Sequence, residues 1–389
     1  MLLEGLKVVE MSSWVAGPSC AAVLADWGAD VVKVESPMGD VTRAFFANPA
    51  NGQSPIYANE NRGKRGVVID TTRPEGRVAL KALLKGADIF VTNTRPGSLR
   101  KIGLDYDSLK AEFPRLIYAA VTGFGLTGPY ANEGGFDITA FWARSGVARA
   151  TIPTDQHPFP SRPGFGDHVT AITTVAGILA ALHERHSTGK GRLVETSLLR
   201  AGSYAIGWDL ALQLYYGEVQ TAGPRNDRPV AISGFFRTKD DRHLVIVPKS
   251  VDCFTNVMIA IDRPEVVADP RFELPMLDMD IVREARAICD EGFARFTLEE
   301  IGERLNSLDV AWGPLCTLAE HAASERAELA GCFVELADGL GGSFRAPATP
   351  VRFPEGAPPV GRQAPFLGQH TREVLEAAGL TPEQIEAIL

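Results

Sequence analysis

The chain has 389 residues, of which 45% are hydrophobic and 22% are charged, a composition typical of a soluble globular protein of about two domains. Its 39 basic and 48 acidic residues give a formal net charge of −9. This balance, without a long tract of Lys or Arg, excludes the basic face on which nucleic-acid-binding proteins depend.

Targeting and cross-linking signals are also absent. No segment reaches the roughly 18–20 continuous apolar residues of a membrane-spanning helix, and residues 1–5 lack the basic region that begins a secretory signal. The five cysteines are scattered and none forms a C-x-x-C pair, which argues against a disulfide framework or a structural zinc site. We therefore expect a cytoplasmic protein with no metal, membrane or nucleic-acid partner.

The first 125 residues alternate between strand and helix patterns. Strands are expected at residues 6–11, 30–34, 66–70, 88–92 and 116–122, and helices at residues 18–27, 74–85 and 106–112. Strand–helix–strand units of this length predict parallel strands with right-handed crossovers, and hence an α/β fold with a doubly wound sheet. Ligands in such folds bind beyond the carboxyl ends of the strands.

The second half of the chain begins with a long apolar helix and then changes character. Further elements are expected as a helix at 168–186, a strand at 192–196, a helix at 198–216, a β-hairpin at 233–247, helices at 254–260, 280–294 and 298–308, and an amphipathic helical tail at 371–389. The change in pattern near residue 224 predicts a second, smaller α+β domain over 225–325.

Common cofactor motifs do not occur. The first strand is not followed by G-x-G-x-x-G, and the chain has no P-loop, no G-x-S-x-G elbow and no H-E-x-x-H motif. His183 and His186 are one helical turn apart without other ligands nearby, which is more typical of a solvated helix end than of a metal site.

The segment Gly-Phe-Gly-Asp-His at 164–168 precedes the long helix. Asp is a favoured N-cap residue and glycine allows the chain to turn, so Asp167 is expected to cap this helix. A carboxylate held at a helix start behind flexible glycines can also be a nucleophile. The local sequence leaves both roles open.

The chain resembles the class III CoA transferases (the CaiB/BaiF family) over about residues 3–380. The matching segments are VAGP at 15–18, LADWGADVVKVE at 24–35, GDVTR at 39–43, NRGKR at 61–65, GD at 166–167, GILAAL at 177–182, TGKG at 188–191, GP at 313–314, TLAE at 317–320 and LGQHT at 367–371. They occur in the order that the family shows.

The resemblance implies an architecture and an activity. A Rossmann-like large domain would span 1–224 and be completed by 326–389, and two protomers would interlock as a homodimer. Asp167 would attack an acyl-CoA thioester to give a mixed anhydride, and CoA thiolate would convert the anhydride to an aspartyl-CoA thioester. A free carboxylic acid would then complete the transfer, with coenzyme A as part of the substrate and no metal.

The resemblance also implies a set of CoA- and substrate-binding residues. These are Trp14, Val15, Ala16, Ser36, Arg43, Ile69, Thr72, Asn93, Thr94, Arg95, Lys101 and Phe136. Val15 stands where formyl-CoA transferase-like members have Gln, which argues against formate or oxalate as substrate. Ser36 stands where many members have an Arg for the nucleotide phosphates. Arg43 or Lys64 could replace that Arg, and Lys101 is the best single phosphate candidate.

The alternative is an acyl-CoA racemase of the α-methylacyl-CoA racemase type. Such enzymes share the fold and use the His of a G-H-D segment as a base that faces the GD aspartate. Phe136 takes the place of that His in the segment 135–137, and a phenyl ring cannot exchange a proton. His157 and His168 lie outside this segment, so the sequence favours the transferase.

The acyl donor and the acceptor acid are not specified by any of these segments. Aromatic residues near the site, namely Phe136, Phe141, Trp142 and Phe165, fit either an apolar acyl pocket or the hydrophobic core.

Overall fold

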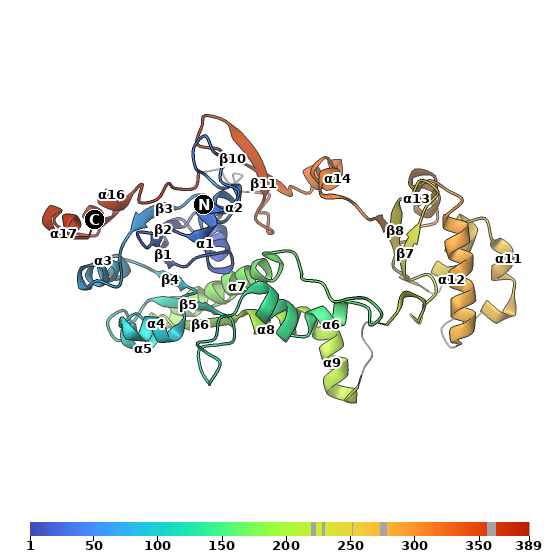
Figure 1. Cartoon of the computed structure of the whole chain (residues 1–389), viewed down its shortest axis with the longest axis horizontal. Helices are drawn as coiled ribbons and strands as arrows, with labels where there is room; N and C mark the ends of the chain where they lie inside the picture. The colour runs from blue at the N-terminus through green and yellow to red at the C-terminus, as the bar shows by residue number, and fades with distance from the viewer. Residues whose placement is uncertain (219–222, 228–229, 251, 273–277, 356–362, 389) are drawn as a thin grey trace. The chain divides into compact units, whose positions relative to one another are not determined.

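The computed structural model describes residues 1–218, 223–227, 230–250, 252–272, 278–355 and 363–388. The chain divides into two compact units: residues 1–148, 159–218 and 328–389 form the first, and residues 149–158 and 219–327 form the second. The first unit is built from both ends of the chain (Figure 1). The second unit contains the expected small domain, 225–325, and adds the segment 149–158, which the sequence analysis placed in the large domain.

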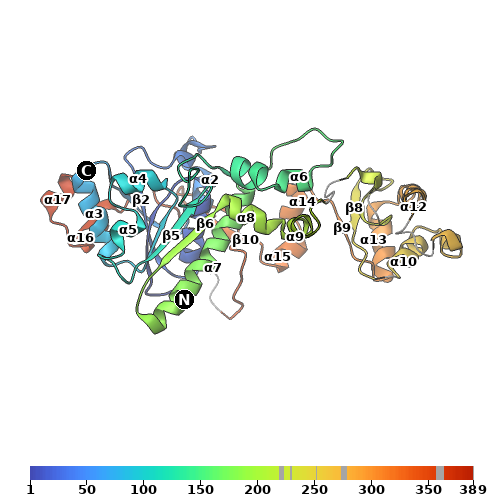
Figure 2. The same ribbon diagram turned by 90° about the horizontal axis from the view of Figure 1, so that it is seen from below.

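A six-stranded parallel sheet forms the centre of the first unit (Figure 2). Its strands are β1 (Lys7–Met11), β2 (Asp30–Glu35), β3 (Arg65–Val68), β4 (Ile89–Thr92), β5 (Ile117–Thr122) and β6 (Leu193–Ser197). Their order is β3-β2-β1-β4-β5-β6 and every pairing is parallel. This is the order of doubly wound nucleotide-binding sheets, and it confirms the predicted parallel α/β fold. The order reverses between β1 and β4, where ligands bind in such sheets.

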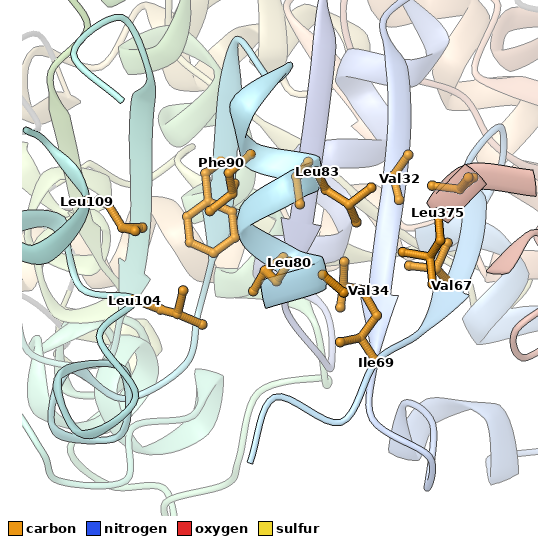
Figure 3. Close-up of a cluster of buried hydrophobic side chains, with 14 of the residues drawn as sticks. Val32, Val34, Val67, Ile69, Leu80, Leu83, Phe90, Leu104, Leu109 and Leu375 are labelled. Carbon is orange, nitrogen blue, oxygen red and sulfur yellow. The ribbon is translucent and has the colours of Figure 1, made fainter. Parts of the chain in front are cut away.

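Helices cover both faces of this sheet because adjacent strand residues point to opposite sides. Val9 packs into a core cluster shared with α3 (Pro74–Lys85), α16 (Thr371–Ala377) and α17 (Pro382–Glu386), part of which Figure 3 shows. Val8 packs on the other face against α1 (Ala16–Asp26) and α7 (Phe165–Thr188). The C-terminal helices therefore complete the same core as the N-terminal strands, and they lie beside α3 in both views (Figures 1 and 2).

Among the described residues, α7 is the one helix whose length and apolar composition would allow it to cross a membrane. It packs against α1, β5 and β6 within the first unit.

The second unit has its own core. The strands β7 (Gly234–Arg237) and β8 (His243–Ile246) form the predicted hairpin, and β9 (Trp312–Pro314), which was not predicted, adds a third antiparallel strand. The helices α10 (Cys253–Ala260), α11 (Pro264–Val267), α12 (Met279–Phe293) and α13 (Leu298–Ser307) enclose its buried side chains, and α14 (Leu318–Ala322) follows β9.

Three predicted helices differ from the structure. The helix expected at 198–216 breaks at Ile206 into α8 (Leu198–Ala205) and α9 (Gly207–Tyr216), where glycine follows and disfavours continuation. The tail helix breaks between α16 and α17 because Gly379 takes a φ of +89°. The helix expected at 106–112 is the single turn α5 (Tyr106–Leu109).

Several short elements were not predicted, because few residues define each of them. They are α2 (Pro55–Asn61), α4 (Pro96–Lys101), the π-helical segment η2 (Asp137–Arg144), α6 (Val147–Thr151), α15 (Glu325–Leu329) and the hairpin β10 (Phe333–Ala337) with β11 (Ser343–Pro347).

Candidate active site

A cavity of about 690 Å³ opens at the carboxyl edge of the sheet, at the point where the strand order reverses. All of its lining residues belong to the first unit. They come from the segments 13–16 after β1, 93–98 after β4, 121–123 at the end of β5, 131–138, and 163–167, together with Leu198. This is the location that a doubly wound sheet predicts for a ligand.

Asp167 lies on the wall of this cavity in the first turn of α7. The helix begins at Phe165 and its N-cap is Gly164, which takes a φ of +87° that glycine tolerates best. The prediction that Asp167 caps the helix is therefore wrong. Within the described part of the chain, no hydrogen bond is recorded for its carboxylate, which leaves its oxygens available to a ligand.

Asp137 takes over part of the capping role that the sequence analysis gave to Asp167. Its Oδ1 accepts a hydrogen bond from the backbone N–H of Gly166 at 3.0 Å, although it belongs to a different segment. Its side chain is nearly buried, and Oδ2 has no hydrogen-bond partner among the described residues. Gly166 permits this contact, because a Cβ there would lie 2.6 Å from Oδ1 of Asp137. Sequence reasoning missed Asp137, although it directly follows Phe136 in the segment compared with G-H-D.

The electrostatic environment raises the pKa values of both carboxyl groups. Burial, and then repulsion from Asp137, raise the pKa of Asp167 to about 7, while His168 opposes the shift. Burial also raises the pKa of Asp137, although the backbone N–H of Gly166 works against it. A carboxylate with a pKa near 7 is partly ionised at neutral pH and more basic than an ordinary Asp, as suits a nucleophile.

His168 supplies a compensating charge beside Asp167. Its Nε2 lies 3.1 Å from Oε1 of the buried Glu60, and this hydrogen bond raises the pKa of His168. The hydroxyl of Ser19 donates to the other oxygen of Glu60. The raised pKa of His168 favours its protonated form, and that charge lowers the pKa of Asp167.

The loop between β1 and α1 forms another part of the cavity wall. Asn93 fixes it, because its Oδ1 accepts from the N–H of Ser13 at 3.0 Å and its Nδ2 donates to the carbonyl of Ser13 at 2.6 Å. Trp14 follows with a φ of +69°, and its N–H donates to Asp40 at 3.3 Å. The Trp14 ring meets the Phe136 ring edge-on at a centroid distance of 5.3 Å. Asn93 therefore acts at least as a positioning residue for this loop.

A buried charged network lies under the same loop. Nζ of Lys33 lies 3.1 Å from both Glu10 and Asp40, and 3.0 Å from the carbonyl of Ser12. Nζ of Lys64 lies 2.7 Å from Glu10 and donates to the carbonyl of Pro18 at 2.8 Å. The two lysines thus hold both ends of the loop at 12–18.

Neither candidate replacement for an Arg at position 36 lines the cavity. Lys64 is buried in the network described above, and burial lowers its pKa to about 8. Nη2 of Arg43 lies 2.6 Å from Glu35, and its Nη1 donates to the carbonyl of Pro365 at 3.1 Å. The structure assigns both cations to internal ion pairs.

The structure brings together part of the predicted site. The lining residues include Trp14, Val15, Ala16, Asn93, Thr94, Arg95, Phe136 and Asp167. Outside the lining, Ile69 is buried in the sheet core, whereas Ser36, Thr72 and Lys101 are exposed. Thr72 donates its hydroxyl to Asp70 at 2.6 Å.

The aromatic residues near the site separate into two groups. Phe141 and Trp142 are core residues, whereas Phe136 and Phe165 are about half exposed. The described residues contain no group of three or more His, Cys, Asp or Glu side chains placed to hold a metal ion.

Comparisons with known proteins show the family of this chain. The family model for CoA-transferase family III matches residues 3–371. The chain is 34% identical to the (R)-2-hydroxy-4-methylpentanoate CoA-transferase of Clostridioides difficile, covering 99% of this chain and 97% of that one. It is 30% identical to the cinnamoyl-CoA:phenyllactate CoA-transferase of Clostridium sporogenes, covering 100% and 96%.

A solved structure shows the same fold. A CaiB/BaiF family protein from Brucella suis superposes with a TM-score of 0.83 at 29% identity, covering 97% of this chain and 99% of that one. The family match spans nearly the whole chain, and the chain belongs to CoA-transferase family III.

Proposed function

We propose that this CoA-transferase moves CoA from an acyl-CoA to a free carboxylic acid through covalent intermediates on Asp167. One observation carries the proposal: the carboxylate of Asp167 lies on the cavity wall without a hydrogen bond to any residue that the structure describes, and its pKa is raised to about 7. A purely structural Asp at a helix start would accept hydrogen bonds from backbone N–H groups, and Asp137 already does so here.

The reaction divides into four balanced displacements. The Asp167 carboxylate attacks the thioester carbonyl, which forms a mixed anhydride and releases CoA thiolate. The thiolate attacks the Asp167 carbonyl, which gives an aspartyl-CoA thioester and the donor acid. The acceptor carboxylate then attacks this thioester to form a second anhydride, and the released thiolate attacks the acceptor carbonyl. The products are the acceptor acyl-CoA and free Asp167.

Arg95 is our preferred contact for a CoA phosphate. It is the one Lys or Arg among the described residues that line the cavity, and it forms no ion pair with another described residue. Ser36, Thr72 and Lys101, which follow the strands β2, β3 and β4 along the chain, remain predicted contacts for CoA. Arg95→Ala should raise the KM for acyl-CoA about tenfold with little change in kcat, as expected for a group that binds ground and transition states alike. A larger effect of Lys101→Ala on KM would favour Lys101 instead.

No observation favours the racemase. Phe136 lines the cavity at the position where the racemase base would stand, and its ring cannot accept a proton.

The test of the proposal is chemical trapping. Wild type incubated with acyl-CoA and then hydroxylamine should carry a hydroxamate at Asp167, detected by peptide mass spectrometry. Asp167→Asn should carry none and should lose roughly four orders of magnitude in kcat. Asp107→Asn, which alters an exposed carboxylate, is the matched control and should behave as wild type.

An Asp167→Asn variant with more than about a tenth of wild-type transfer would contradict the proposal. Deamidation of the variant must be excluded by mass spectrometry.

We also propose that the protein is an interlocked homodimer. No residue of α9 is buried, and its aromatic side chains Trp208, Tyr215 and Tyr216 are exposed together with Tyr204 of α8. Such an apolar surface is typical of an interface. Analytical ultracentrifugation should show a dimer at micromolar concentration, and its dissociation should coincide with unfolding. A folded monomer would contradict this proposal.

A further inference from the structure

The wall of the cavity next to Asp167 is apolar. Trp14 and Val15 contribute from one loop, Phe136 and Ile138 from a second, and Pro163 from the segment before α7. From this wall we infer a substrate class: the protein selects acyl groups whose chain is uncharged and apolar, and Phe136 with Trp14 determines that choice. This inference rests on the proposed function.

A hydrogen bond joins the segment that carries Phe136 to the segment that carries Asp167. Asp137 accepts from the N–H of Gly166 at 3.0 Å. Phe136 directly precedes Asp137, and Asp167 directly follows Gly166. The residues that carry the phenyl ring and the carboxylate are therefore each adjacent in sequence to one partner of this hydrogen bond. Phe136 and Asp167 line the same cavity, so an acyl group bonded to Asp167 would occupy a space that Phe136 borders.

The loop that carries Trp14 and Val15 also contacts Phe136 and the start of α7. The Trp14 ring packs edge-on against the Phe136 ring, and the Phe45 ring lies 5.8 Å from Trp14. Val15 reaches the start of α7, because its Cγ1 lies 3.8 Å from where a Cβ on Gly164 would stand. Among the four side chains Trp14, Val15, Phe45 and Phe136, all offer dispersion contacts and the Trp14 indole is the one hydrogen-bond donor.

The charges of the lining residues also favour an uncharged acyl chain. The acidic residues among the lining are Glu133, Asp137 and Asp167, whereas Arg95 is the one described Lys or Arg among them. Arg95 lies over Gly134, because a Cβ there would be 3.1 Å from its Nη2, and the proposed function uses it for CoA. A second carboxylate on the acyl chain would therefore be desolvated beside like charges, which is costly.

Two isosteric donors isolate this effect. The 4-methylpentanoyl and succinyl groups have the same heavy-atom skeleton and differ in an isopropyl group against a carboxylate. With acetate as acceptor, wild type should use 4-methylpentanoyl-CoA with a kcat/KM at least about tenfold higher than succinyl-CoA. Phe136→Arg should reduce this ratio at least about tenfold, because it adds a cation at the acyl position.

Phe353→Ala is the control for loss of an aromatic contact. Phe353 meets Trp27 edge-on at 5.6 Å, as Phe136 meets Trp14, but it does not line the cavity. This variant should keep the wild-type ratio, whereas Phe136→Ala should raise the KM for 4-methylpentanoyl-CoA more than that for succinyl-CoA.

The outcomes separate the inference from the proposed function. Equal or better use of succinyl-CoA by wild type, or a ratio within twofold of wild type in Phe136→Arg, would overturn the inference while Asp167 is still trapped by hydroxylamine. Absence of the Asp167 adduct with every donor would instead overturn the proposed function.

Discussion

The first unit contains two groups of buried charged residues, and they differ in whether their charges are paired. In the network under the β1–α1 loop, Lys33 and Lys64 each lie within 3.1 Å of Glu10. Burial alone would raise the pKa of Glu10, but the two lysines lower it. At the start of α7, burial and mutual repulsion raise the pKa of Asp167, and one oxygen of Asp137 has no described partner.

The difference distinguishes a scaffold from a reactive site. A buried ion that is paired on every side keeps its charge and fixes the backbone around it. A carboxylate that is buried without a direct partner stays basic and available, at a cost in stability that the rest of the fold must offset. The paired network fixes the loop at 12–18, and residues 13–16 of this loop line the same cavity as Asp137 and Asp167.

Breaking the paired network should have the largest effect on stability. Lys33→Met leaves Glu10 and Asp40 with less compensation, and we expect it to lower the free energy of unfolding by about 3–5 kcal/mol. Urea denaturation at pH 7 measures this. Lys110→Met, which removes an exposed ion pair with Asp107, is the control and should cost less than about 1 kcal/mol. Equal costs for the two variants would mean that the network is not a scaffold.

Replacing the proposed nucleophile should raise the free energy of unfolding, whereas breaking the network lowers it. The pKa of Asp167 rises from an ordinary value near 3.8 to about 7 in the folded chain, so ionisation weakens the fold as pH rises between these values. Asp167→Asn should therefore be more stable than wild type at pH 8, by about 1–2 kcal/mol, since partial solvent exposure screens the charge. The gain should disappear below about pH 4. Melting temperatures of both proteins from pH 4 to 8 test this, and a less stable variant at pH 8 would contradict it.

The smallest effect concerns the repulsion between the two carboxylates. Asp137→Asn retains an oxygen for the N–H of Gly166 but removes a negative charge, so the pKa of Asp167 should fall. The acid limb of kcat/KM should move to lower pH by up to about one unit. His168→Gln removes a neighbouring positive charge and should move the limb to higher pH. If both variants are active and the acid limb of kcat/KM stays at the wild-type pH in each, the group that titrates in this limb is not Asp167.

Local sequence patterns predicted the regular strands and helices of the fold but not the points where helices are interrupted. The strands from β1 to β6 were each expected within a few residues, because the buried strands have continuous apolar runs bounded by turn residues. The break at Ile206 and the short strand β9 were missed, since one glycine or three strand residues carry little signal without their neighbours.

The sequence by itself determined the alternation of strands and helices and, through its resemblance to a family, the position of Asp167. It did not determine that Asp137 accepts the hydrogen bond at the start of α7, that Arg43 and Lys64 are held in internal pairs, or that Phe136 is exposed while Phe141 is core. Helical and strand periods are properties of neighbouring residues and can be read along the chain. Several partners of these charges and rings come from segments that are distant along the chain, as Gly166 is from Asp137, and only the tertiary structure decides which of them meet.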